Sequence, residues 1–110
     1  MGDRMDLQKH KIRDPAFMRR FRKGHKCCEI CGKEDCLEIA HIISKGAGGP
    51  DMEENVVMLD GPAAFQAGCH GANHMGKISK KELFKVAAHR IGITPEECER
   101  RVRRRMGYNV

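Results

Sequence analysis

Residues 37–59, LEIAHIISKGAGGPDMEENVVML, constrain the fold more than any other part of the chain. Residues 37–43 alternate as in a strand, with His41 on the same face as three aliphatic residues. Residues 44–51 contain three glycines and a proline, a composition typical of a turn, and residues 55–59 form a second apolar run. The segment therefore predicts a β-hairpin whose first strand carries a histidine, which is either an ordinary core residue or a functional one.

Helices are predicted on both sides of this hairpin. They cover residues 13–24, 69–77, 79–92 and 94–107. The first begins with Asp14 as its N-cap and a proline at the first helical position. The third begins with a capping box made by Ser79 and Glu82, and the fourth begins with Thr94 and a proline. Residues 27–36 are too irregular for a helix or a strand and predict a knuckle-like turn.

The charge of the chain is unevenly distributed. Residues 1–26 carry nine Lys and Arg against three Asp and Glu, residues 27–76 carry two against eight, and residues 77–110 carry ten against four. Two basic flanks around an acidic centre favour a protein that grips phosphates at both ends. The alternative is that these charges are solvated faces of ordinary helices.

The six cysteines indicate a metal site. No signal peptide or membrane span is visible, so we expect a cytoplasmic protein whose cysteines are reduced. Cys28-x2-Cys31 has the spacing with which one turn presents two thiolates to a tetrahedral zinc ion. Cys69 is the expected third ligand, and the fourth is either Asp60 or Cys36. The alternative is a buried cysteine cluster without metal.

His70 and His74 are four residues apart, so a helix places both imidazoles on one face, as joint metal ligation requires. Taken alone, this spacing is also common among surface histidines. The order of motifs is more informative: a cysteine pair, a strand histidine, a glycine-rich turn, an asparagine that opens a strand, and a CH-x3-H segment.

In this order the chain resembles the HNH endonucleases. The matching motifs are Cys28-x2-Cys31, LEIAHII, GGPD…ENVVML and GCHGANH, and they cover about residues 27–77. The resemblance implies an α+β fold with a small zinc-stapled ββα-metal core, in which a two-stranded antiparallel hairpin faces one helix. We expect one domain, 1–110, with a basic N-terminal helix in 1–26 and basic helices in 78–110.

The resemblance also implies a role for each site residue. His41 is the general base, and Asn55 orders the hairpin so that the base stays oriented. His70 and His74 bind the catalytic metal ion, and we expect all three imidazoles to face one pocket. A histidine suits this role because its unperturbed pKa of about 6.5 lets it accept a proton near neutral pH.

Two positions depart from the family pattern. Ala40 stands where many members carry Asp or His as a further metal ligand, which predicts a weaker or more selective catalytic site. Two imidazoles favour Mn²⁺, Ni²⁺ or Zn²⁺ over Mg²⁺, which prefers oxygen ligands. Asp60 stands where members often carry a cysteine, which leaves the fourth zinc ligand open.

These observations predict a metal-dependent DNA endonuclease, a hydrolase that cuts or nicks phosphodiester bonds. The alternative is a non-catalytic, zinc-stapled DNA-binding module with a degraded nuclease site. We expect mostly phosphate contacts and low sequence specificity. The candidate DNA-binding residues are Arg19, Arg20, Arg22, Lys23, Lys45, Lys77, Arg101, Arg104 and Arg105. A homodimer, or a place in phage or mobile-element machinery, is a further expectation, and no membrane contact is expected.

Overall fold

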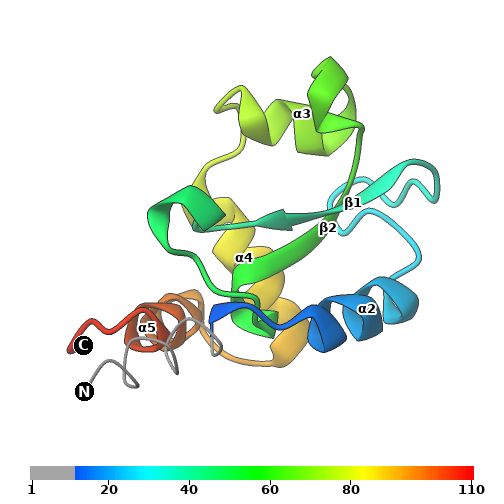
Figure 1. The fold of residues 1–110 in the computed structure, drawn as a ribbon. Helices are drawn as coiled ribbons and strands as arrows, with labels where there is room; N and C mark the ends of the chain where they lie inside the picture. Colours follow the sequence, from blue (N-terminus) through cyan, green and yellow to red (C-terminus); the bar gives the residue numbers. More distant parts are fainter. Residues whose placement is uncertain (1–11) are drawn as a thin grey trace.

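A computed structural model describes residues 12–110 of the chain and confirms the predicted α+β class (Figure 1). Strands β1 (Leu37–His41) and β2 (Val56–Asp60) pair antiparallel, with Leu37 opposite Asp60 and His41 opposite Val56. The helices are α2 (Pro15–Gly24), α3 (Gly68–His74), α4 (Lys80–Ile91) and α5 (Pro95–Arg105). The first eleven residues of the predicted basic segment 1–26 lie outside the described part. Among residues 12–110, no helix combines the length and apolar character that a membrane span needs.

The N-caps predicted from the sequence are present in the structure. The side chains of Asp14, Ser79 and Thr94 each accept a hydrogen bond from the backbone N–H three residues further on. Each bond satisfies one amide that the first turn of a helix leaves without a partner. These short polar residues therefore fix where α2, α4 and α5 begin.

The hairpin lies between two hydrophobic clusters. One face of the hairpin, with Ala40, Val57 and Leu59, packs against the buried side of α4 and α5. The other face, with Val56 and Met58, packs against Phe21 of α2. Direct strand partners share a face, so His41 lies on the α2 face and Glu38 on the α4 face.

Asn55 closes the end of the hairpin and makes β1 shorter than the predicted strand 37–43. Its Oδ1 accepts from the N–H of Ile43 at 2.8 Å, and its Nδ2 donates to the carbonyls of Ile43 and Pro50, both at 3.0 Å. The backbone groups of Ile43 are thus satisfied by a side chain rather than by a partner strand. Asn55 itself belongs to a short 3₁₀ turn, and β2 starts one residue later than predicted.

Arg90 of α4 joins the hairpin to the knuckle, a role that no motif in the sequence indicated. Its guanidinium bonds both carboxylate oxygens of Glu29 at 2.7 Å and the carbonyl of Val56 at 3.0 Å. It also lies over the ring of Phe21, 4.9 Å from the centroid. Only 14% of the Arg90 side chain is exposed. From α4 this residue therefore contacts α2, β2 and the knuckle at once.

Candidate functional site

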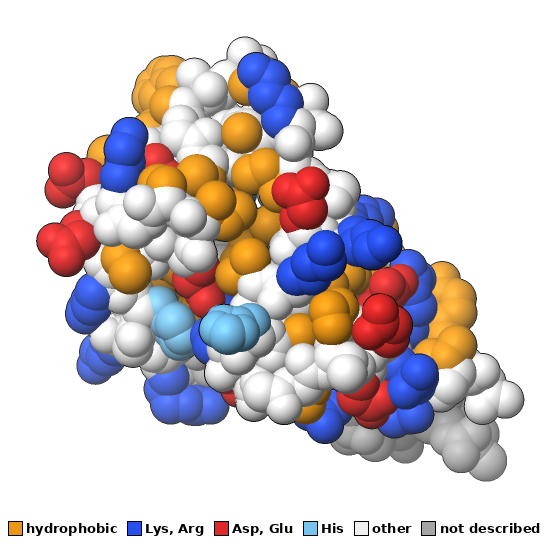
Figure 2. Space-filling view, turned by 180° about the vertical axis from the view of Figure 1, so that it is seen from behind, with side chains coloured by type: hydrophobic (Ala, Val, Ile, Leu, Met, Phe, Trp, Pro, Cys, Tyr) orange, Lys and Arg blue, Asp and Glu red, His pale blue; other side chains and the backbone are white. Residues whose placement is uncertain are grey.

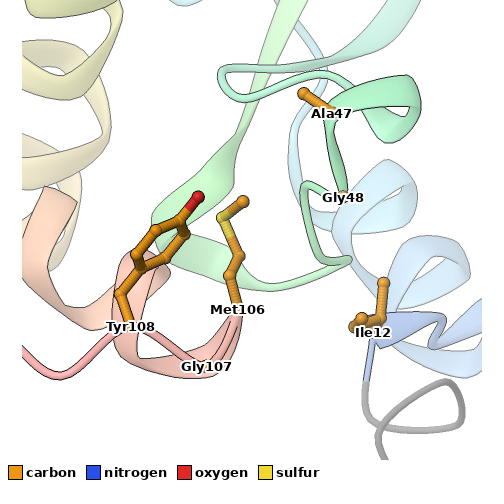
Figure 3. A pocket seen from close by; sticks show the side chains of 6 residues that line it. All are labelled: Ile12, Ala47, Gly48, Met106, Gly107 and Tyr108. Atoms are coloured by element: carbon orange, nitrogen blue, oxygen red, sulfur yellow. The ribbon is translucent and has the colours of Figure 1, made fainter. Parts of the chain in front are cut away.

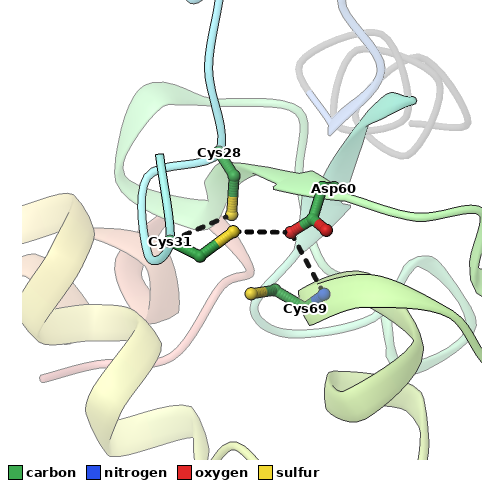
Figure 4. A group of neighbouring side chains, drawn as sticks. All are labelled: Cys28, Cys31, Asp60 and Cys69. Atoms are coloured by element: carbon green, nitrogen blue, oxygen red, sulfur yellow. Dashed lines mark hydrogen bonds between the residues drawn. The ribbon is translucent and has the colours of Figure 1, made fainter. Parts of the chain in front are cut away.

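Four metal-ligating side chains meet between the knuckle, the end of β2 and the start of α3 (Figure 4). They are Cys28, Cys31, Asp60 and Cys69, whose donor atoms all lie within 4.8 Å of one another. The Cys31 thiol donates to Oδ1 of Asp60 at 3.1 Å, and the Cys69 amide donates to the same oxygen at 3.2 Å. A tetrahedral zinc ion with bonds of about 2.3 Å holds its sulfurs about 3.8 Å apart, so this group fits zinc after a small contraction.

The chemistry of these donors also fits a cation. Hydrogen bonding to the Cys31 thiol holds the pKa of Asp60 well below its usual range, so the carboxylate stays charged. Burial, followed by the hydrogen bond to Asp60, raises the pKa of the Cys69 thiol. A divalent cation offsets the cost of gathering such anionic ligands in one place. A side chain at Gly68 would collide with Asp60, at 2.5 Å, so glycine is needed there for α3 to approach the cluster.

The remaining cysteines lie outside this group. Cys36, the alternative fourth ligand, is exposed and is absent from the four-residue cluster, as is exposed Cys27. Cys98 is fully buried in α5, where burial raises its pKa to about 11. The structure therefore places Asp60, not Cys36, beside the other three donors.

His41 forms a part-buried pair with Asp51, a residue from the glycine-rich turn. Its Nε2 lies 2.7 Å from Oδ1 of Asp51, and the side chains are 9% and 6% exposed. Asp51 also accepts from the guanidinium of Arg13 at 2.8 Å and from the Asp14 amide at 2.9 Å. Asp51 thus holds the imidazole in place and anchors it to the start of α2.

The surroundings of His41 favour a neutral ring. Burial lowers its pKa below the usual value, and the Asp51 carboxylate only partly opposes this effect. Burial raises the pKa of Asp51, but hydrogen bonds from the Asp14 amide and from His41 outweigh it, so the net shift is downward. A neutral imidazole beside a charged carboxylate donates through Nε2 and keeps Nδ1 able to accept a proton.

His70 and His74 lie together on α3, with ring centroids 4.7 Å apart in an edge-to-face arrangement. Nδ1 of His70 lies 2.8 Å from Oε1 of Glu38 on β1. A hydrogen bond from the Ala63 amide, followed by the one to His70, lowers the pKa of Glu38. Glu38 is thus an ionised partner for His70 that the sequence alone did not indicate.

The structure gives His41 and His70 different partners. Among the described residues, no hydrogen bond or ring contact joins His41 to His70 or His74. Glu38 and His41 point to opposite faces of β1, and three residue steps along a strand span roughly 10 Å. Convergence of all three imidazoles on one pocket stays a prediction.

The predicted DNA-binding cations fall into two groups. Within the described residues, no ion pair involves Arg19, Arg20, Arg22 or Lys23 of α2, nor exposed Lys45 and Lys77. In α5, Arg101 pairs with Glu54 and Glu97, and Arg104 also approaches Glu97. Figure 2 shows basic side chains gathered at the lower left, over α2, and basic and acidic side chains mixed at the lower right, over α5. Arg105 lies at the end of α5.

A pocket of about 270 Å³ lies between the glycine-rich turn and the C-terminal tail (Figure 3). Its lining residues are Ile12, Ala47, Gly48, Met106, Gly107 and Tyr108. None of the predicted catalytic or metal-binding residues contributes to this lining. The four metal-ligating side chains, the His41–Asp51 pair and the His70–Glu38 pair all lie outside this lining.

Two residues of the candidate site were missed by sequence reasoning. The alternation of residues 37–43 places Glu38 on the face opposite His41, but it predicts no partner for Glu38. Asp51 was counted only as a turn residue, ten positions from His41. For Glu38, the alternation of the strand was a signal that could have indicated its face. For Asp51 there was no such signal, because its contact with His41 depends on how the turn folds back onto β1.

The comparison with family models identifies residues 28–59 as similar to the family described as HNH endonuclease. This segment contains Cys28, Cys31, His41 and Asn55 and ends just before Asp60. The match confirms the resemblance to this family that the ordered motifs indicated. No curated protein and no solved structure matches the chain.

Proposed function

Because residues 28–59 match the HNH endonuclease model, we propose that this chain is a metal-dependent DNA endonuclease that hydrolyses phosphodiester bonds. The family match supports a nuclease-type function in general. The observation that carries the catalytic assignment is the part-buried pair of His41 and Asp51, at 2.7 Å. A histidine oriented by a carboxylate is a suitable general base, because one ring nitrogen is held while the other remains available.

His41 accepts the proton of the attacking water at Nδ1 in this proposal. Asp51 holds the opposite ring nitrogen and stabilises the imidazolium that forms. The lowered pKa of His41 keeps the ring neutral at neutral pH, as a base requires. Asn55 holds the backbone at Ile43, two residues beyond the base, and so keeps the end of the strand in position.

His70 and His74 would hold the catalytic divalent ion, Mn²⁺, Mg²⁺, Ni²⁺ or Zn²⁺. Their rings are adjacent and His70 has a carboxylate partner, which suits imidazole ligation. When bound, such an ion polarises the phosphoryl oxygen and stabilises the departing oxygen. Cys28, Cys31, Cys69 and Asp60 would hold the structural zinc ion.

DNA would be held mainly by the cations of α2. Its four basic residues have no acidic partner among the described residues, whereas arginines of α5 form ion pairs with glutamates, which reduces the charge they offer to DNA. Phosphate contacts of this kind give affinity with little base specificity. A homodimer, a role in phage or mobile-element machinery and a cytoplasmic location stay predictions.

The test is nicking of supercoiled plasmid by the purified chain with Mn²⁺, Mg²⁺, Ni²⁺ or EDTA. We expect metal-dependent relaxation by the wild type, and its loss in His41→Ala with DNA binding retained. His89→Ala is the matched control, because His89 is exposed on α4 and should leave nicking unchanged. Undiminished cutting by His41→Ala would refute the catalytic assignment.

A non-catalytic DNA-binding module is the second candidate. Ala40 removes a ligand position, and His41 lies on the opposite face of β1 from Glu38, the partner of His70, which favours this alternative. The same plasmid assay decides between them. Binding without relaxation under any of the ions would support the module.

A further inference from the structure

We propose that Glu38 is a positioning residue that fixes the proton of His70 on Nδ1 and so directs Nε2 toward a metal ion. The hydrogen bond between Glu38 and His70 is present in the structure, whereas the binding of a metal ion by His70 is part of the proposed function.

The contact with His70 is one of two hydrogen bonds made by the same oxygen of Glu38, whose side chain is 41% exposed. Oε1 of Glu38 lies 2.8 Å from Nδ1 of His70 and accepts a second hydrogen bond from the Ala63 amide, also at 2.8 Å. His70 is buried, with its side chain 11% exposed, so its ring has little freedom to exchange this partner for water. One carboxylate oxygen therefore connects β1, the loop after β2 and helix α3.

Gly61 makes this arrangement possible. A Cβ added at Gly61 would lie 2.5 Å from Oε1 of Glu38 and 2.9 Å from the Ala63 amide nitrogen. The backbone thus passes directly over the carboxylate, at a distance that only glycine allows. A loop that closes so tightly on one oxygen holds that oxygen in a defined place.

The consequence for metal binding follows from the chemistry of the imidazole ring. A neutral ring carries one proton, and the nitrogen that donates to a carboxylate leaves the other nitrogen as the ligand. Such partners orient the ring, and their loss typically lowers metal affinity by about 10- to 100-fold. A site with two imidazoles and no ligand at position 40 has few other constraints on its geometry.

The test combines the tautomer of His70 with the affinity for Ni²⁺. In the full chain with zinc in its cysteine site, ¹⁵N NMR should show His70 protonated at Nδ1, and calorimetry should show additional Ni²⁺ binding that His70→Ala removes. In Glu38→Ala we expect loss of the Nδ1–H signature and about 10- to 100-fold weaker Ni²⁺ binding. Glu38→Gln keeps an acceptor oxygen and should recover the tautomer and part of the affinity.

Glu96→Ala is the control, since Glu96 is exposed in the first turn of α5. An unchanged Nδ1–H signature or unchanged Ni²⁺ affinity in Glu38→Ala would overturn the proposal. Absence of Ni²⁺ binding in the wild type would do the same. If Glu38→Ala does not fold, the Gln variant must still keep the tautomer for the proposal to stand. None of these readouts requires DNA cleavage, so an inactive wild type would refute the nuclease function alone.

Discussion

Replacing Asn55 with alanine should destabilise the fold strongly, although it removes only a small amide. Asn55 is fully buried and satisfies three backbone groups: the N–H and C=O of Ile43 and the C=O of Pro50. Each hydrogen bond contributes about 1 kcal/mol net, and each buried group left without a partner costs about 1 to 3 kcal/mol. Allowing for some water entry, we expect the free energy of unfolding to fall by about 3 to 5 kcal/mol.

The measurement is urea unfolding followed by circular dichroism. The dependence of the free energy of unfolding on urea concentration should be the same in the wild type and the variant, which shows that the unfolded state has not changed. Asn109→Ala is the matched control, because Asn109 is exposed near the C-terminus and should change stability by less than about 0.5 kcal/mol. Asn55→Asp keeps the acceptor but turns a charge toward two carbonyls, so it should destabilise as well. A loss below about 1 kcal/mol in Asn55→Ala would show that the side chain does not hold the hairpin.

Three further predictions concern the zinc site, Arg90 and the base. Cys31→Ser should lose bound zinc in metal analysis and Cys36→Ser should retain it; the reverse pattern would contradict the four-residue cluster. Arg90→Met removes the guanidinium from the carboxylate of Glu29, which then keeps the hydrogen bond from the Met58 amide but no cation, and should cost about 3 to 5 kcal/mol in urea unfolding. Arg100→Met should cost less than about 1 kcal/mol, because its pair with Glu97 is more exposed, and equal losses would refute this ranking. His41 should titrate by NMR below pH 6.5, and lower still in Asp51→Asn, because the carboxylate favours the charged ring. The folded chain binds the proton of the His41 ring less tightly than the unfolded chain does. The contribution of His41 to stability is therefore present above pH 6.5 and declines on acidification. A His41 ring that titrates above pH 6.5 would disprove the predicted direction.

Local signals in the sequence predicted most of the secondary structure. Asp14, Ser79 and Thr94 marked helix starts because an N-cap acts within its own first turn. The hairpin was predictable because alternation and turn composition are also local. The strand limits were less certain, since the Asn55 side chain replaces part of the strand ladder at Ile43.

The contacts that shape the candidate site depend on long-range folding. Arg90 and Glu29 are 61 residues apart, and Glu38 and His70 are 32 apart, so no spacing rule connects them. The cysteine pair was an exception, because the CxxC spacing is itself a geometric requirement of zinc. Charge counts were informative about net balance, but they could not show that, within residues 12–110, the arginines of α5 form ion pairs and those of α2 do not.

Asp51 connects two parts of the proposed machinery, since it accepts hydrogen bonds from Arg13 and from the N-cap residue of α2 and also contacts the imidazole of His41. If α2 binds DNA, a shift at the start of α2 reaches the imidazole of His41 through the carboxylate of Asp51. Changes that alter how α2 binds DNA should then also alter the position of the ring. Charge-removing changes in α2 should accordingly reduce kcat as well as raise KM, instead of weakening substrate capture alone.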